Sequence, residues 1–409
     1  MNPGKTLFNL AFAFKQSKIW KKVFEDELFA VDLDGEIGYC SLMGRNGQHT
    51  ALAVYVGDQG FSSLRYLQEI DPGNITDLLS QDCVQCSLEK REEFTPEELA
   101  AIQAYCKEAG LSFRAPFPQF SRYYPNCVPT PVTDKADWQH LRTALRVVNA
   151  LAELLQDHTK EELGLRSIVF DTAGEAYAGA WMPSGALSYN PRVTIPLYRL
   201  KKYEIQGSLI PLPPYSERLP MPPTHVNEIA LSRLKKLPQA GVYQCRIIRV
   251  PEPVEGKPPY LPALLLAVDE DTGLVLEPAT AEGANYDSDA LLNEFLTNLV
   301  SQKVYPAAIL VNTEETRVLL ADFCAKAGIR LEITEDLPEL EEAIDAMNER
   351  FHSSSTPRSL DEVFARLNQL SVSELADLPE AMLTQLRMLA AAGQLPDALR
   401  KKLAQIPEH

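Results

Sequence analysis

The feature that most constrains the fold is the stretch 258–347, where short apolar runs alternate with amphipathic segments. Its first run, 264–268, is unbroken, which is typical of a strand buried on both faces. Further strands are predicted at 307–311 and 329–333, and helices at 290–300, 313–325 and 340–347. Because alternating strands and helices favour parallel pairing, this stretch predicts an α/β layer.

A hairpin is predicted directly after the first of these strands. Residues 269–273 (DEDTG) supply turn-forming side chains, and 274–276 is expected to return as the second arm. A hairpin that carries Asp, followed by alternating helices and strands, resembles the ribonuclease-H-like fold. That resemblance implies carboxylates on the first strand, on the strand after the first helix and on a late helix, which together hold divalent metal ions.

The sequence fills this implied metal site only in part. Asp269, with Asp271 beside it, is the candidate on the first strand, whereas Asn312, a neutral and weak ligand, follows the next strand. The candidates on the late helix are Glu339, Glu342 and Asp345. Asp269 and Asp271 also have a simpler interpretation as hairpin-turn residues, because Asp favours turns. Mg²⁺ or Mn²⁺ is therefore the alternative to a protein without a cofactor.

The N-terminal part predicts an antiparallel meander with helices. Strands are expected at 28–33, 37–43 and 51–56, and helices at 61–68, 96–107 and 134–156. Asp34-Gly35 and Asn46-Gly47 separate the strands and are strong hairpin signals. Thr95 and Glu98 form a capping box that begins the second helix. Residues 1–190 are thus expected to form an α+β domain.

Two further segments complete the predicted organisation. The stretch 191–262 holds fourteen of the thirty prolines, so we expect an extended connector over 191–257. The α/β layer is assigned to 258–350. Short helices with capping signals predict a small helical tail over 358–409, which would dock on the body or on another protein.

Cys83-Val84-Gln85-Cys86 is the sharpest local pattern in the chain. Paired thiolates at this spacing form half of many zinc sites, which makes Cys83 and Cys86 metal candidates. No second CxxC follows, so zinc is a weaker alternative than Mg²⁺ or Mn²⁺. Buried structural thiols are the other interpretation of the pair.

Charge and composition narrow the classes of function. A net charge of −17 argues against a protein whose main role is to wrap nucleic acid. The sequence has no apolar run of the ~18 residues that a membrane span needs. Seven cysteines at irregular spacing suit a reducing compartment, so a cytoplasmic protein is expected. Walker, GxGxxG and GxSxG motifs are not found.

Three segments resemble an uncharacterised bacterial family. They read LFAVDLDGEIGYCSLMGRNGQHTALAVYVGDQG, QDCVQCSLEKREEFTPEELAAIQ and GLSFRAPFPQFSRYYPNCVP. The family is sometimes found beside transposon-passenger ORF-3-like proteins, and the 258–347 unit looks like a second domain of unknown function that follows it. The resemblance implies a two-domain architecture and no reaction.

These observations predict a non-catalytic binding or regulatory protein, with a protein partner for the helical tail. The alternative is a divalent-metal-dependent nuclease or phosphotransferase that uses Asp269, Asp271 and Glu342.

Overall fold

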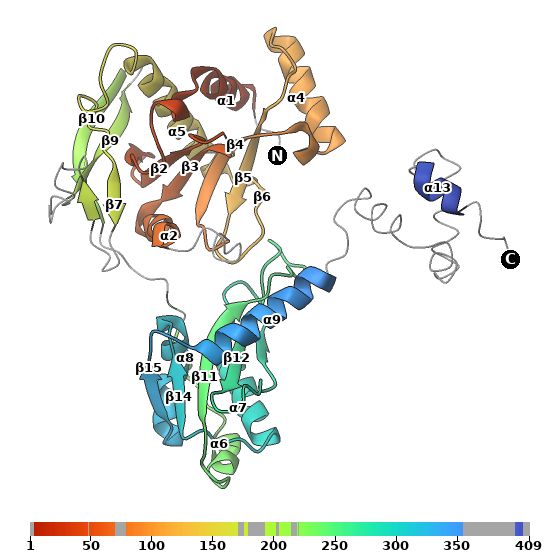
Figure 1. Cartoon of the computed structure of the whole chain (residues 1–409). Helices are drawn as coiled ribbons and strands as arrows, with labels where there is room; N and C mark the ends of the chain where they lie inside the picture. Colours follow the sequence, from red (N-terminus) through yellow and green to blue (C-terminus); the bar gives the residue numbers. More distant parts are fainter. Residues whose placement is uncertain are drawn as a thin grey trace, which may run out of the picture. The chain divides into compact units, whose positions relative to one another are not determined.

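The computed structural model describes residues 4–47, 49–69, 79–170, 176–178, 193–201, 204–213, 219, 221–354 and 397–403 (Figure 1). The chain divides into two compact units, Met1–Glu341 and Glu342–His409. The first unit holds two mixed sheets with separate hydrophobic cores. Of the predicted tail at 358–409, only helix α13 (Asp397–Leu403) lies within the described residues.

The first sheet has eight strands among the described residues, in the order β10-β9-β1-β2-β3-β4-β5-β6. Their bounds are β1 Phe29–Asp32, β2 Ile37–Met43, β3 Thr50–Val56, β4 Cys83–Glu89, β5 Phe117–Tyr123, β6 Thr130–Pro131, β9 Thr194–Lys201 and β10 Glu204–Pro211. Strands β1 to β6 pair antiparallel in chain order, and β9 pairs parallel with β1. The sheet is therefore mixed.

The turn between β1 and β2 shows why these strands lie where they do. Asp34 and Gly35 both have positive φ, 62° and 111°. A two-residue hairpin requires such angles, and Asp-Gly adopts them at low cost. The turn brings Asp32 opposite Ile37, which sets the register of the pair.

Helices cover both faces of this sheet. The bounds are α1 Lys5–Ser17, α2 Gly57–Glu69, α4 Pro96–Ala109 and α5 Lys135–Leu154. α1 and α5 pack together over one face, and α2 lies on the opposite face. The predicted capping box of α4 is confirmed, because the Thr95 side chain accepts from the Glu98 amide and the Glu98 side chain accepts from the Thr95 amide.

The prediction of an extended connector at 191–257 is wrong. This segment supplies β9 and β10 to the first sheet, and helix α6 (Glu228–Leu234) and strand β11 (Val242–Arg249) to the second. Ile195 and Leu197 of β9 are buried, so the strand belongs to the core. The prolines misled the prediction because they cluster at strand ends and in the stretches between elements.

The second sheet has the strand order β13-β12-β11-β14-β15. The bounds of its elements are β12 Ala263–Asp269, β13 Ala279–Ala281, α7 Ser288–Ser301, β14 Ala308–Val311, α8 Glu314–Ala327, β15 Arg330–Ile333 and α9 Pro338–Ser354. β11, β12 and β13 pair antiparallel, whereas β14 and β15 run parallel to β11. α6, α7 and α8 bury one face, in a core that includes Phe295 and Phe323.

Two expectations about this layer need correction. Its first strand is β11, which the sequence prediction had left in the connector, and not 264–268. The segment 274–276 forms no strand, since only an isolated bridge joins Val275 to Val268, and β13 supplies the second arm instead.

The remaining helix–strand predictions here are met: Thr313 caps α8, and Gly328, at φ 74°, ends it. A short antiparallel strand pair, β7 (Ile168–Phe170) with β8 (Ala176–Ala178), is also present. No helix within the described residues combines the length and the apolarity needed to cross a bilayer.

Candidate functional site

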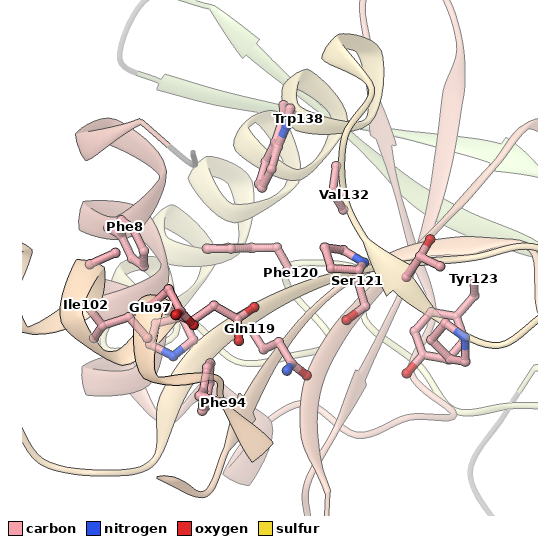
Figure 2. Close-up of a pocket in the computed structure, with 16 residues that line it drawn as sticks. Phe8, Phe94, Glu97, Ile102, Gln119, Phe120, Ser121, Tyr123, Val132 and Trp138 are labelled. Carbon is pink, nitrogen blue, oxygen red and sulfur yellow. The ribbon is translucent and has the colours of Figure 1, made fainter. Parts of the chain in front are cut away.

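A groove of about 520 Å³ lies along strand β5 in the first sheet. Its lining comes from α1, from the first turns of α4, from β5 and β6, and from the start of α5. Figure 2 shows Phe94 and Ile102 at one end of the row of side chains and Tyr123 at the other. The lining therefore includes most of β5.

Aromatic rings contribute to the wall of the groove. Five of them line the groove, namely Phe8, Phe94, Phe120, Tyr123 and Trp138. Phe120 contacts two of the others edge-on, with ring centroids 5.8 Å from Phe8 and 5.6 Å from Trp138. Such edge-to-face contacts hold the rings in fixed orientations, and so the groove is preformed.

The sequence explains how these rings reach one place. α1 packs Phe8 between Phe120 and Tyr105 of α4. α5 begins at its N-cap Asp134, which places Trp138 within the first two turns. The segment FRAPFPQFSRYYPNCVP, where the sequence analysis predicts no strand, contains β5, and this strand contributes five residues to the groove.

Only two of the residues that line the groove are charged, and both are carboxylates at the start of α4. Glu98 uses its carboxylate for the capping box, where it accepts hydrogen bonds from the Thr95 amide and hydroxyl. Glu97 is exposed to solvent. Because the lining has no Lys, Arg or His, the groove offers no charge that would hold an anion.

Besides the two glutamates, the polar side chains of the lining are Gln119, Ser121, Tyr123, Thr130 and the Trp138 indole, all of which can donate a hydrogen bond. Burial raises the pKa of Tyr123 to about 12, so its hydroxyl stays protonated at neutral pH. The Trp138 indole nitrogen is buried and has no hydrogen-bond partner among the described residues. The Gln119 amide donates to the Glu93 carbonyl at 3.4 Å. The groove is thus suited to a ligand with an apolar body and a few acceptors.

The sheet edge beside the groove is poorly suited to accept another strand. β6 pairs with β5 only at Ser121 and Arg122. Two prolines that line the groove lie on these strands, Pro118 on β5 and Pro131 on β6. Proline has no amide hydrogen to donate, so it interrupts a hydrogen-bond ladder. A ligand here has to be held mainly by side-chain contacts.

Cys83 and Cys86 lie on strand β4 and face opposite sides of the sheet. Cys83 belongs to the core under α2, and Cys86 to the core under α1 and α5. Since side chains alternate along a strand, residues three apart point to opposite faces. The structure therefore does not bring these two thiols together as ligands of one metal ion. Burial raises the pKa of the Cys83 thiol to about 12 and that of Cys86 still further.

Asp269 is the last residue of β12, and Asp271 lies in the turn that follows. The Asp269 carboxylate accepts from the Thr272 amide and hydroxyl, at 2.9 and 2.8 Å. Burial pushes the pKa of Asp269 upward, but hydrogen bonds from Thr272 and Tyr243 outweigh it and leave the pKa below its ordinary value. Asp271 is exposed, and Glu342 lies exposed on α9. The described residues include no group of three or more His, Cys, Asp or Glu placed to hold a metal ion.

Arg246 lies on β11, which is the first strand of the α/β layer. Gln244 pairs with Leu310 of β14, so Arg246 and Asn312 each lie two residues further along neighbouring strands. Arg246 forms a two-pronged ion pair with Glu341 of α9, at 2.5 and 3.0 Å. This charge-assisted pair fixes Glu341 of α9 against β11.

Reasoning from the sequence missed the groove. Its residues come from five elements spread over 8–138, and no motif links them. The one available signal was the density of aromatic residues and prolines at 113–131, which we interpreted as packing.

Comparison with known families gives two matches. Residues 5–167 match a domain of unknown function, DUF7309, and residues 230–348 match another, DUF6930. A comparison with curated proteins found no match.

Two solved structures from HTLV-2 are similar over part of the chain. The trimeric form of the integrase catalytic core domain in complex with magnesium is 17% identical, with a TM-score of 0.22, and the match covers 33% of this chain and 88% of that one. The dimeric form is 15% identical, with a TM-score of 0.21, over 32% and 88%. Likeness at such TM-scores carries no argument about fold or activity. The chain is thus similar to two separate family models, each described as a domain of unknown function, over 5–167 and 230–348.

Proposed function

We propose that the chain is a non-catalytic binding protein and that the groove along β5 is its binding site for an apolar ligand that is neutral or cationic. The observation that carries the proposal is the lining itself, with five aromatic rings, three prolines and no basic side chain. Concave sites of this size and composition are the usual form of a ligand pocket. The proposal requires no cofactor.

The second domain supports a binding role over the alternative of a metal-dependent nuclease or phosphotransferase. The strand order, three antiparallel strands followed by two parallel ones, supports our assignment of this layer as ribonuclease-H-like. Within that fold two of the three carboxylate positions hold Arg246 and Asn312, neither of which is a carboxylate, and Arg246 is paired with Glu341. A cation held in place of a metal ion argues for a scaffold without the metal chemistry.

A protein partner for the tail, the cytoplasmic location and the link to transposon-passenger proteins stay predictions. Residues 355–396, which make up most of the tail, lie outside the described part of the chain.

The groove can be tested with a neutral aromatic fluorescent probe, N-phenyl-1-naphthylamine. Ala101 lines the groove on α4, so Ala101→Phe fills it from the wall without removing a core side chain. We expect the wild-type chain to enhance the fluorescence of the probe with micromolar affinity, and Ala101→Phe to weaken binding about tenfold or more. Ala100→Phe is the matched control, because Ala100 is exposed on the same helix and does not line the groove.

Equal binding by the Ala101→Phe and Ala100→Phe variants would refute the groove as the site. The anionic analogue 1-anilinonaphthalene-8-sulfonate should bind the wild-type chain more weakly than the neutral probe, because the lining carries negative charge only.

A further inference from the structure

We propose that the natural ligand of the groove is an extended, proline-rich peptide segment of a partner protein, with a lysine or arginine at the end that lies over the start of α4. This inference rests on the proposed function and names the class of ligand for the same site. The argument uses the shape of the groove, the chemistry of its edge, and the position of its charge.

The shape favours a linear ligand over a compact one. The lining includes 118–121 and Tyr123 of β5, together with the half-buried rings of Phe94, before α4, and Trp138, on α5 (Figure 2). An elongated ligand reaches both of these rings. An extended peptide rises about 3.1 Å per residue in the polyproline II conformation, so several of its residues contact the wall at once.

The edge chemistry favours polyproline II over an added strand. Strand addition needs a continuous row of donors and acceptors, and Pro118 and Pro131 remove donors from this edge. A polyproline II peptide makes no such ladder. Its proline rings pack on aromatic faces, and its free carbonyls accept from isolated donors such as the Thr130 hydroxyl of the lining.

The conformational entropy of the unbound peptide also favours a ligand that contains proline. An ordinary flexible peptide loses about 1–2 kcal/mol of backbone entropy for each residue that becomes fixed. Proline already has a fixed φ, and a proline-rich segment is extended before it binds. A preformed groove with few hydrogen-bonding groups therefore gains more from a ligand that is already ordered.

The charge fixes the direction of the peptide. Glu97 is exposed at the α4 end of the groove, whereas the Glu98 carboxylate is used by Thr95. Both lie in the first turn of α4. A Lys or Arg of the ligand beside Glu97 gains an ion pair, and a carboxylate there is repelled. Proline-rich segments with one basic end thus match both the rings and the charge.

The experiment uses fluorescence anisotropy with three labelled peptides and the full chain. The first is acetyl-PPAPPLPPRG-amide, the second replaces its Arg with Glu, and the third is acetyl-GGAGGLGGRG-amide. We expect the first peptide to bind, the second to bind about threefold more weakly, and the third to bind at least about tenfold more weakly. Ala101→Phe should abolish binding of the first peptide, and Ala100→Phe should leave it unchanged.

Glu97→Gln tests the charge contact separately. Because Glu97 is exposed, this substitution should weaken binding of the arginine peptide about threefold and should not weaken binding of the glutamate peptide. A change in folding would weaken the binding of both peptides. A peptide with the sequence of residues 211–223, PLPPYSERLPMPP, is added as a further probe. If it binds more tightly than the first peptide, the occupant is this chain itself, and the partner-protein inference is overturned.

The outcomes also separate the two proposals. Binding of N-phenyl-1-naphthylamine that Ala101→Phe blocks, together with no preference for the proline peptide over the glycine peptide, overturns this inference and leaves the binding site in place. Failure of both the probe and the peptides overturns both.

Discussion

At the scale of single residues, position in the fold decides what a reactive side chain can do. Cys83 and Cys86 are close in sequence but lie on opposite faces of β4, each within its own core. Asp269 is likewise committed to a turn, where it accepts two hydrogen bonds from Thr272. Side chains that the sequence offers as ligands therefore have structural roles, which are set by burial and hydrogen bonding.

The buried thiols lead to a prediction about pH. All seven cysteines are free and buried, and burial raises the pKa of Cys83 to about 12. The folded-state pKa lies above the ordinary thiol value, so the thiolate does not form as the pH rises through about 8.5. We expect no fast reaction with 5,5′-dithiobis(2-nitrobenzoate) between about pH 7 and pH 9, and reaction of all seven thiols in guanidinium chloride.

A rapid, pH-dependent reaction of one or two native thiols would contradict this prediction. Cys83→Ser and Cys86→Ser variants would then show whether the CxxC pair is responsible.

At the scale of elements, α9 shows how a helix is fixed to a sheet by few contacts. Its first turn buries Leu340, whose amide donates to the Gln244 side chain of β11 at 3.0 Å. The ion pair between Arg246 and Glu341 lies one residue further on. Two neighbouring side chains of β11 therefore position the start of α9.

The Arg246 ion pair can be tested by hydrogen exchange. Arg246 is largely buried, with 19% of its side chain exposed, and Arg246→Ala leaves Glu341 without its partner. We expect the loss of about 1 kcal/mol of local stability, and hence about fivefold faster amide exchange in the first turns of α9. Mass spectrometry of deuterated peptides from 336–350 measures this rate.

Arg330→Ala is the matched control, because Arg330 pairs with Glu332 on β15 with 67% of its side chain exposed. Exposed pairs contribute little, so exchange in α9 should not change. Equal effects of the two substitutions would show that the Arg246 pair does not hold the helix.

At the scale of the whole molecule, segments distant in sequence complete each sheet. β9 follows the predicted end of the N-terminal domain at residue 190, yet it pairs parallel with β1. It contributes Ile195, Leu197 and Tyr198 to buried clusters on the two faces of the sheet. The first sheet is therefore incomplete without residues up to 211.

A comparison of two fragments tests this dependence. A fragment of residues 1–190 lacks β9 and β10 and leaves the edge of β1 open, whereas residues 1–213 contain the whole sheet. Burial of each large apolar side chain contributes about 1.5–3 kcal/mol, so we expect the shorter fragment to be less stable by more than about 4 kcal/mol. Urea unfolding followed by tryptophan fluorescence measures the difference, and equal midpoints would contradict it.

The sequence by itself determined the local elements. Turn residues such as Asp34-Gly35, caps such as Thr95 and Thr313, and apolar periodicity located most helices and strands, because these signals act within a few residues. β11 escaped because prolines surround it, and β5 because aromatic residues and prolines hid its alternation. Such exceptions occur where pairing with distant strands stabilises a segment that its own residues specify weakly.

Only the tertiary structure decided which side chains meet. It separated Cys83 from Cys86, placed Arg246 against Glu341, and brought side chains from α1, α4, β5 and α5 into one groove. Each of these depends on strand order and on which face a residue takes, and a sequence pattern does not fix either over long distances. The physical reason is that the hydrophobic effect is nearly non-directional. It requires apolar side chains to lie inside the protein, but the pairing and register of the strands decide which side chains become neighbours there.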